Sequence, residues 1–466
     1  MPFLNHLRRW SDEQPGESAL ENGADVLSYA DLHGRATALL PETGDLSTLA
    51  LPNGAEFVVR LAAGVSGERR CAVLDPAWPA PQAHAVRDRL QALHATAHVG
   101  SALRELGDGP PDSVFLYGFT SGTTSVPKAF RRTRGSWPLQ DSIDLFGLSR
   151  HDRTLIPGAF STGLSLYALA ESLHAGAAVL TMPRFDVGAA LASIRHRGVT
   201  RIVAVPSALR LIAARGLASG VGGGAVANIV SGGARLDADT RRLLTRWAPA
   251  ATIHEYFGAA ELSFVSASKQ LPGTVHDDTT STGVGRPFPG VGVAVRDPAG
   301  HDRAPGEPGT IVVRSSLVCE GYAWGDDGQG FRREGEWNTV GDQGMLDADG
   351  TLHYLGRAAD MIVTGGHNVY PHEVEAALEA AAGVTAVVVT GQPDAARGTR
   401  VIAAVLGDPA LRAASLRGAA GGLAEAKRPR GYYRLTELPL TPAGKISRRL
   451  LGQWIDEGDP RAQQLD

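Results

Sequence analysis

The sequence predicts an α/β fold: a large N-terminal domain of layered, mostly parallel sheets and helices with a β-rich subdomain, followed by a small α+β C-terminal domain. Three observations lead to this fold class. The chain has 466 residues, which is too long for one ordinary core. Short apolar runs alternate with helical patterns over the first three-quarters of the chain, as in parallel sheets covered by helices. After about residue 285 the segments become rich in glycine, proline and β-forming residues, and the pattern changes again near residue 357.

The alternation of strands and helices is clearest between residues 114 and 256. Helical spacing of apolar residues predicts a helix over 189–196, another that begins at Ser207 as N-cap, and a third that Asp237 starts. Short apolar runs predict strands over 114–119, 177–182, 201–205, 227–230 and 252–256.

The domain boundaries follow the two changes of pattern. We place the N-terminal domain at 1–357, its β-rich subdomain at 284–356, and the C-terminal domain at 358–466. Within these, the sequence predicts a strand over 309–315, a helix over 371–382 with Pro371 near its start, and a strand over 386–390. The polar tail after Asp456 is expected to be loose.

Composition excludes several classes of function. The net charge of −4 is small, so nucleic acid is not an expected partner. No apolar run reaches the roughly 18 residues of a membrane span, and residues 1–15 carry charges without the apolar centre of a secretion signal. The two cysteines, Cys71 and Cys319, are too few for a disulfide framework and are expected to be free thiols. We therefore expect a cytoplasmic protein with no membrane partner.

Lysine is scarce. Lys128, Lys269, Lys427 and Lys445 are the only lysines in the chain, and the other basic residues are arginines. A lysine kept in such a background suggests a need for the compact, flexible ammonium group. Two of the four lie in the motifs described next.

The segment from Phe119 to Lys128 is the most informative part of the sequence. A predicted strand runs into hydroxyl residues around a glycine, followed by a lysine, and such hydroxyls and backbone N–H groups can surround phosphate oxygens. The spacing differs from that of a Walker loop. Taken alone, the segment could also be an exposed Ser/Thr linker.

This segment resembles the phosphate loop of the superfamily of acyl-CoA synthetases, luciferases and peptide-synthetase adenylation domains. Further motifs of that family follow in its order: Ser231 to Ala234, Tyr256 to Glu261, Val340 to Asp342, Gly356 to Pro371, and Pro442 to Ile446. A stretch at Leu51 to Phe57 is also compatible. The family's later loop glycines are replaced by Ser125 and Ala129, and its usual threonine by Ala260.

The resemblance implies an adenylate-forming enzyme that uses ATP, magnesium and a small-molecule carboxylic acid. It assigns Lys445, Glu261 and Thr123 to catalysis, with Glu261 also holding the metal on the phosphates. The C-terminal domain of such enzymes is mobile, and the hinge would lie at Ala359 or Asp360, where the usual Asp or Lys pivot is replaced by alanine. The residues assigned to ATP or AMP are Thr120, Ser121, Gly122, Thr124, Lys128, Gly232, Gly233, Ala234, Phe257, Gly258, Asp342 and Arg357.

The acid pocket can be predicted only in part. Peptide-synthetase domains carry an aspartate near the segment that matches 157–163, and none is present there. An uncharged aryl or aliphatic acid therefore fits better than an α-amino acid. Phe160 and Gly163 are expected at the pocket, although core packing explains Phe160 nearly as well.

Three functions stay open. The first is an acyl- or aryl-CoA ligase, with coenzyme A as acceptor. The second is a standalone adenylation enzyme of specialised metabolism whose acceptor is an acyl carrier protein, an amine or another nucleophile. The third is a homologue that binds nucleotide without turnover; the joint presence of Lys445, Glu261 and Asp342 argues against it.

Overall fold

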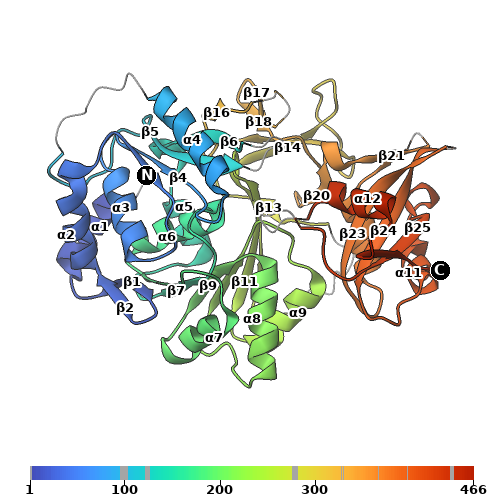
Figure 1. Ribbon diagram of the computed structural model, residues 1–466, viewed down its shortest axis with the longest axis horizontal. Coiled ribbons are helices and arrows are strands. Elements are labelled where there is room, and N and C mark those ends of the chain that lie inside the picture. The colour runs from blue at the N-terminus through green and yellow to red at the C-terminus, as the bar shows by residue number, and fades with distance from the viewer. Residues whose placement is uncertain are drawn as a thin grey trace. The chain divides into compact units, whose positions relative to one another are not determined.

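The computed structural model describes residues 3–94, 103–120, 126–274, 282–326, 328, 330–365, 367–395, 397–440 and 446–466, with only the backbone for Ala359 and Asn368. Figure 1 shows the chain as layers of strands and helices. By their internal contacts the residues form two compact units. The first comprises 1–276, 285–293 and 313–340, and the second comprises 277–284, 294–312 and 341–466. Because this grouping crosses the chain several times, the predicted domain boundary at 357 stays a prediction.

A nine-stranded sheet is the largest layer of the first unit. The five pairings from β11 through β10, β9, β7 and β8 to β1 are parallel, whereas the strands at both edges are antiparallel. The strand order is β13 (Arg286–Pro287), β12 (Ser263–Gln270), β11 (Thr252–Ala259), β10 (Asn228–Ser231), β9 (Arg201–Ala204), β7 (Arg153–Ile156), β8 (Ala178–Thr181), β1 (Ser18–Asn22) and β2 (Asp25–Ser28).

Helices pack against this sheet and bury its central strands. Strands β8 and β9 are buried at every residue, as expected for parallel strands covered on both faces. One apolar core joins β7 to β11 with the helices that follow them, and Trp247 and Leu244 of α9 lie in it. The helices of this unit are α1 (Leu4–Glu13), α2 (Tyr29–Leu39), α3 (Ala55–Gly64), α4 (Ala80–Leu93), α5 (Gln140–Phe146), α6 (Gly163–Ala175), α7 (Val187–His196), α8 (Pro206–Ala218) and α9 (Ala238–Trp247).

A second, five-stranded sheet of the first unit carries the segment that flanks the predicted phosphate loop. Its order is β16 (Gly321–Trp324), β6 (Lys128–Thr133), β5 (Val114–Thr120), β4 (Arg70–Val73) and β3 (Leu46–Leu49). The pairs β3–β4 and β4–β5 are parallel, and β5–β6 and β6–β16 are antiparallel. Strand β16 comes from a part of the chain almost 200 residues after β6, so this sheet brings distant segments together.

The region between 284 and 357 contains strands as its regular elements in the described residues, as expected for the β-rich segment. Strand β15 (Gly309–Arg314) pairs with β18 (Trp337–Thr339) in the first unit and with β19 (Asp342–Leu346) in the second. Strands β14 (Gly292–Arg296), β17 (Arg332–Glu334) and β20 (Leu352–Arg357) also belong to this region, and β20 forms a hairpin with β19. Strands β13 and β16 lie in the region too, but they pair in the two sheets described above.

The rest of the second unit is an α+β arrangement. Strands β23 (Val384–Asp394), β24 (Gly398–Gly407), β25 (Gly431–Leu435) and β26 (Ala462–Gln464) form one sheet in that order. Helices α10 (Pro371–Glu379), α11 (Ala413–Ala419) and α12 (Arg448–Glu457) accompany it, and the short strands β21 (Ile362–Thr364) and β22 (His367–Val369) form a hairpin. Apolar residues of α10, α11 and β23 to β25 share a core.

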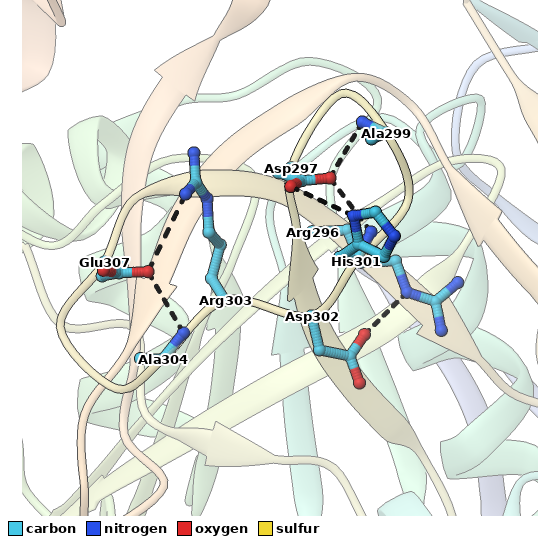
Figure 2. Close-up of polar contacts among 8 residues, drawn as sticks. All are labelled: Arg296, Asp297, Ala299, His301, Asp302, Arg303, Ala304 and Glu307. Carbon is cyan, nitrogen blue, oxygen red and sulfur yellow. Dashed lines mark hydrogen bonds and ion pairs between the residues drawn. The ribbon is translucent and has the colours of Figure 1, made fainter.

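The turn after β14 is fixed by its own side chains, as Figure 2 shows. The Asp297 carboxylate accepts hydrogen bonds from the backbone N–H groups of Ala299 at 2.8 Å and His301 at 3.0 Å. These bonds hold the pKa of Asp297 below its usual range, the bond from His301 first. Arg296 donates to Asp302 at 2.8 Å on the opposite side of the turn. An aspartate at the start of a tight turn thus supplies the acceptor that the backbone lacks.

The predicted elements between 114 and 256 are confirmed, including Asp237 as the N-cap of α9. Two expectations are wrong. Ser207 is not an N-cap, because α8 begins at Pro206 and Val205 is its cap; the fixed φ of proline suits the first helical position. The tail after Asp456 is not loose throughout, because β26 pairs with β25. Among the described residues, no helix is long and apolar enough to cross a membrane.

Candidate active site

Strands β5 and β6 hold the two ends of the predicted phosphate loop. Thr120 is the last residue of β5 and Lys128 the first of β6, and the two are paired in the antiparallel register. This pairing brings the lysine beside the strand from which the loop leaves. The predicted loop residues Ser121, Gly122, Thr123 and Thr124, together with Ser125, lie outside the described residues.

Glu261 lies in the turn of the β11–β12 hairpin. The turn is tight: a Cβ on Gly258 would lie 1.9 Å from the carbonyl oxygen of Ser263, and Ser263 itself has φ +60°. Glycine is therefore required at 258, and the hairpin bulges there. The Glu261 residue is only 6% exposed. A carboxylate this buried needs partners.

Three contacts fix Glu261 and its neighbour Ala260 in the turn. The Arg132 guanidinium, which is buried, donates to the backbone carbonyl of Ala260 at 2.5 Å, and the N–H of Cys319 donates to the carbonyl of Glu261 at 2.8 Å. The hydroxyl of Tyr322 donates to Oε1 of the Glu261 carboxylate at 2.6 Å. Burial lowers the pKa of Arg132, and the nearby Cys319 and Glu261 oppose that effect. Backbone and side chain of Glu261 are thus held from two strands of the other sheet and the segment before β16.

Tyr322 was not predicted by the sequence analysis, and it connects the predicted residues of the first unit. Besides its bond to Glu261, it lies with its ring 5.5 Å from the Lys128 Nζ, within cation–π range, and its hydroxyl interacts with the Thr120 side chain. Burial first, and then the charge of Glu261, raise the pKa of the Tyr322 phenol, so it stays a donor. Its partners lie about 60 and 200 residues away in sequence, so no local pattern points to it.

The predicted adenine turn follows β10. A Cβ on Gly232 would lie 2.5 Å from the Tyr256 ring, and Gly233 has φ +83°, so both positions favour glycine for different reasons. Gly233 and Ala234 are exposed, and Phe257 and Gly258 are half-buried on β11, which pairs with β10 in parallel. The turn and β11 are therefore neighbours at the carboxyl ends of parallel strands, where α/β sheets bind ligands.

Asp342 and Arg357 lie together in the second unit. They are register partners on β19 and β20, and the Arg357 Nε lies 3.4 Å from the Asp342 Oδ1. Asp342 is buried and the Arg357 side chain is 56% exposed. The role of this pair in ribose binding stays a prediction.

The predicted hinge is tied to α12 by an ion-pair cluster within the second unit. Asp360 lies 3.7 Å from Arg448, whose guanidinium donates to both oxygens of Glu375 at 2.8 and 2.9 Å. Glu375 also accepts from the N–H of Val389 at 2.8 Å and pairs with His372 at 2.9 Å. Burial would raise the pKa of Glu375, but these partners lower it. Lys445 lies outside the described residues, three positions before Arg448.

Comparison with known proteins decides the family. The sequence profile of the AMP-binding enzyme family matches residues 82–323, and that of the AMP-binding enzyme C-terminal domain matches 373–445. The chain is 32% identical to an uncharacterized acyl-CoA ligase, YhfT, of Bacillus subtilis over 74% of this chain and 70% of that protein. This chain belongs to the AMP-binding enzyme family.

Further comparisons agree. The chain is 31% identical to indoleacetate–CoA ligase of Aromatoleum aromaticum over 74% of this chain and 68% of that one. ATP-bound MatB from Rhodopseudomonas palustris has a TM-score of 0.81 at 25% identity, covering 98% of this AMP-binding enzyme and 100% of that structure. The o-succinylbenzoate CoA synthetase of Bacillus subtilis, solved with ATP and a magnesium ion, has a TM-score of 0.80 at 22% identity over 96% and 99%. The predicted adenylate-forming fold is confirmed.

The residues of this AMP-binding enzyme suit magnesium bound mainly through a nucleotide. Within the described residues no cluster of three His, Cys, Asp or Glu side chains could hold a metal. Glu261 is a single buried carboxylate whose Oε1 is engaged by Tyr322, and no hydrogen bond to Oε2 is found in the described part of the chain. Magnesium commonly takes one or two carboxylates plus substrate phosphates, so this donor set fits.

Asn53 has a structural role in the stretch from Leu51 to Phe57, whose sequence is compatible with the family. Its buried amide donates to the Gly158 carbonyl and the Thr181 hydroxyl, both at 2.8 Å, and accepts from the Phe160 N–H at 2.8 Å. Phe160 is fully buried against Phe57, with ring centroids 5.2 Å apart. Gly163 starts α6 and is exposed. The segment predicted to line the acid pocket is thus fastened by one side chain, and the roles of Phe160 and Gly163 there stay predictions.

Proposed function

We propose that this chain joins ATP and a carboxylic acid to form an acyl-AMP and then transfers the acyl group to coenzyme A. One observation carries the proposal. Glu261, an almost fully buried carboxylate, is hydrogen-bonded to Tyr322, whose ring lies against Lys128 at the edge of the phosphate loop. Family membership supplies the reaction class.

In the first step a carboxylate oxygen of the acid attacks the α-phosphorus of ATP. The new O–P bond forms as the bond between the α-phosphorus and the bridging oxygen breaks, and pyrophosphate leaves with that oxygen. Both partners are anions, so the site must reduce their repulsion and hold them in line. Lys445 would contact the carboxylate and the α-phosphate, and Lys128 and the hydroxyls of 120–124 would hold the leaving phosphates. Magnesium, when held by Glu261, would neutralise part of the phosphate charge.

Other residues would hold the nucleoside. Gly232 to Ala234 and Phe257 would accept the adenine ring, and Asp342 and Arg357 would bind the ribose hydroxyls. In the second step the thiolate of coenzyme A attacks the acyl carbon, a C–S bond forms, the bond from that carbon to the phosphate oxygen breaks, and AMP leaves with that oxygen. A hinge at Ala359 or Asp360 would let the C-terminal domain serve both steps.

The acid is expected to be aryl or aliphatic. No acidic residue lies in 157–163 to pair with an α-ammonium group, and the relatives named above include an indoleacetate–CoA ligase and an acyl-CoA ligase. An acyl carrier protein or an amine as acceptor is the second candidate, supported by Ser125, Ala129 and Ala260, which depart from the family motifs. A non-catalytic nucleotide-binding homologue is the third. The cytoplasmic location stays a prediction.

The test is ATP-dependent pyrophosphate release across a panel of aryl and aliphatic acids, with and without coenzyme A. We expect release that requires an acid, together with a thioester product when coenzyme A is present. Acid-dependent release without any thioester would favour another acceptor. If no acid of the panel gives pyrophosphate release, in protein that still binds ATP, the non-catalytic homologue is favoured.

Lys445→Ala is the matched test of mechanism. We expect acyl-AMP formation to fall by at least about a thousandfold, because one group that contacts both reactants is lost. Melting temperature should not change. Lys269→Ala, which removes an exposed lysine, is the control and should keep full activity. Equal activity of the two variants would exclude the role of Lys445.

A further inference from the structure

Tyr322 is the residue at which the candidate metal carboxylate and the edge of the phosphate loop meet. Its hydroxyl reaches Glu261 at 2.6 Å and interacts with Thr120, and its ring lies 5.5 Å from the ammonium of Lys128. We propose that Tyr322 is a positioning residue that holds the Glu261 carboxylate for magnesium and keeps Lys128 at the phosphate loop. This inference rests on the proposed function, because it assigns Tyr322 to the same ATP site.

The place of Tyr322 in the fold supports a positioning role. It lies on β16, the edge strand of the five-stranded sheet, opposite Phe130 of β6. Glu261 belongs to a hairpin of the nine-stranded sheet. The bond from Tyr322 to Glu261 therefore joins the two sheets at the site. The strand that carries Tyr322 is held in place by Trp324, whose indole N–H donates to the Pro127 carbonyl at 2.8 Å.

The chemistry of the contact explains how Tyr322 could help metal binding without touching the metal. A neutral hydroxyl that donates to Oε1 fixes the carboxylate in one orientation, and it adds no charge that would repel a cation. A free glutamate side chain would lose rotamer freedom on binding the metal, and this hydrogen bond has already restricted it. The backbone of the same turn is fixed separately by Arg132 and Cys319. Removal of the hydroxyl should therefore loosen the carboxylate while the turn stays in place.

The ring and the hydroxyl have separable roles. Tyr322→Phe removes the bond to Glu261 and the contact with Thr120, and it leaves a ring for Lys128. Tyr322→Leu removes both. We expect the first variant to change the metal requirement alone, and the second also to weaken ATP binding measured without metal, because the cation–π contact is lost.

The experiment measures binding of α,β-methylene-ATP, which cannot release pyrophosphate, by calorimetry at a series of magnesium concentrations. Mn²⁺ paramagnetic resonance with the same nucleotide gives a second readout of the metal itself. For Tyr322→Phe we expect the metal concentration at half-maximal effect to rise about tenfold, as for loss of a hydrogen bond to a charged group. Glu261→Gln should raise it at least as much.

Two controls make the result specific. Tyr117 lies on β5 of the same sheet, and its hydroxyl forms a hydrogen bond with His94 at 2.9 Å. Tyr117→Phe removes this hydroxyl and should leave the metal requirement unchanged. In a Glu261→Gln background, Tyr322→Phe should not raise the metal requirement further, because the hydroxyl acts on the metal through Glu261.

The outcomes separate this inference from the proposed function. If wild-type protein binds the nucleotide with no dependence on metal, the metal role of Glu261 fails and the inference fails with it. If wild type and Glu261→Gln differ as expected but Tyr322→Phe matches wild type, only the inference is overturned. A Tyr322→Phe variant with a lower melting temperature and an unchanged metal requirement would make Tyr322 a packing residue and would also overturn it.

Discussion

A single side chain can hold an irregular segment in place when both of its N–H donors and its carbonyl oxygen are engaged. Asn53 is such a residue, because its amide makes two donor bonds and one acceptor bond while it is 5% exposed. Its partners Gly158 and Phe160 belong to the segment expected at the acid pocket. The order of that segment therefore depends on a residue about 100 positions earlier in the chain.

We predict that Asn53→Ala lowers the free energy of unfolding by about 2–3 kcal/mol, because buried partners are left without hydrogen bonds. Urea denaturation at neutral pH measures the change. Asn5→Ala, at an exposed position where the side chain accepts one hydrogen bond from the Asp108 N–H at 3.2 Å, should cost no more than about 1 kcal/mol. Similar losses for the two variants would mean that the segment is held by its apolar contacts instead.

Individual site residues differ in how far the sequence could predict them. Glu261, Lys128 and Asp342 lie in motifs whose residue types and order suggest their chemistry. Tyr322 and the role of Asn53 could not be predicted, since each acts through partners from distant strands. The roles of Lys445 and of the loop residues 121–124 stay predictions, since these residues lie outside the described part of the chain.

At the scale of elements, α12 is anchored at its first residue. Arg448 donates to both oxygens of the buried Glu375 on α10 and lies near Asp360, so two helices and the segment before β21 share one ion-pair cluster. Removing one partner of such a pair leaves a buried charge poorly compensated, which costs more than the pair itself contributes.

We predict that Arg448→Ala destabilises the protein by about 3 kcal/mol, whereas Arg449→Ala, an exposed neighbour on the same helix, has almost no effect. Thermal and urea unfolding of the two variants provide the comparison. His372 still contacts Glu375 at 2.9 Å in the first variant, so part of the compensation of the buried carboxylate remains. Indistinguishable stabilities would show that Glu375 does not depend on Arg448.

Element boundaries show where local patterns stop being informative. The central strands were predicted because parallel strands buried on both faces are continuous apolar runs. Ser207 was predicted as an N-cap by residue type, but the preceding proline starts the helix earlier. The strand at Ala462–Gln464 could not be predicted, because its polar sequence pairs through backbone groups with β25 and carries no apolar pattern.

At the scale of the whole molecule, buried histidines couple stability to pH. His254 is 2% exposed on β11, and burial first, then Lys269 and Arg201, lower its pKa to about 4. Burial likewise lowers the pKa of His174 to about 3, with the stacked His6 as the next cause. In the folded state both rings stay neutral at pH values at which the unfolded chain binds protons. The contribution of these two histidines to the free energy of unfolding should therefore be fully present above about pH 6.5. It should fall as the pH drops from there toward their folded-state pKa values.

We predict that His254→Leu reduces this loss. Between pH 7 and pH 4 the wild type should lose roughly 3 kcal/mol of unfolding free energy through His254 alone, and the variant should lack that share. Urea unfolding at several pH values measures it. His84→Leu, at an exposed position, should keep the wild-type pH dependence. Parallel curves for wild type and His254→Leu would contradict the prediction.

The overall architecture was predictable because it follows from local patterns along the chain. These are the strand and helix patterns, their alternation, and the change to β-rich segments after residue 285. The division into two units was less predictable. Strands β14 and β15 each cross from one unit to the other, and such crossings depend on contacts between distant segments that a local pattern does not contain.

The backbone bond from Cys319 to the Glu261 carbonyl has a practical consequence. Both cysteines of the chain are buried in the first unit, and burial raises the pKa of each thiol. A thiol reagent can therefore modify Cys319 only when its surroundings open, and the Cys319 backbone N–H is bonded to the turn that carries Glu261. In a Cys71→Ala variant, Cys319 is the only thiol. Its labelling rate would measure how often the region around this turn opens. Slower labelling with nucleotide present would show that the nucleotide stabilises the closed form.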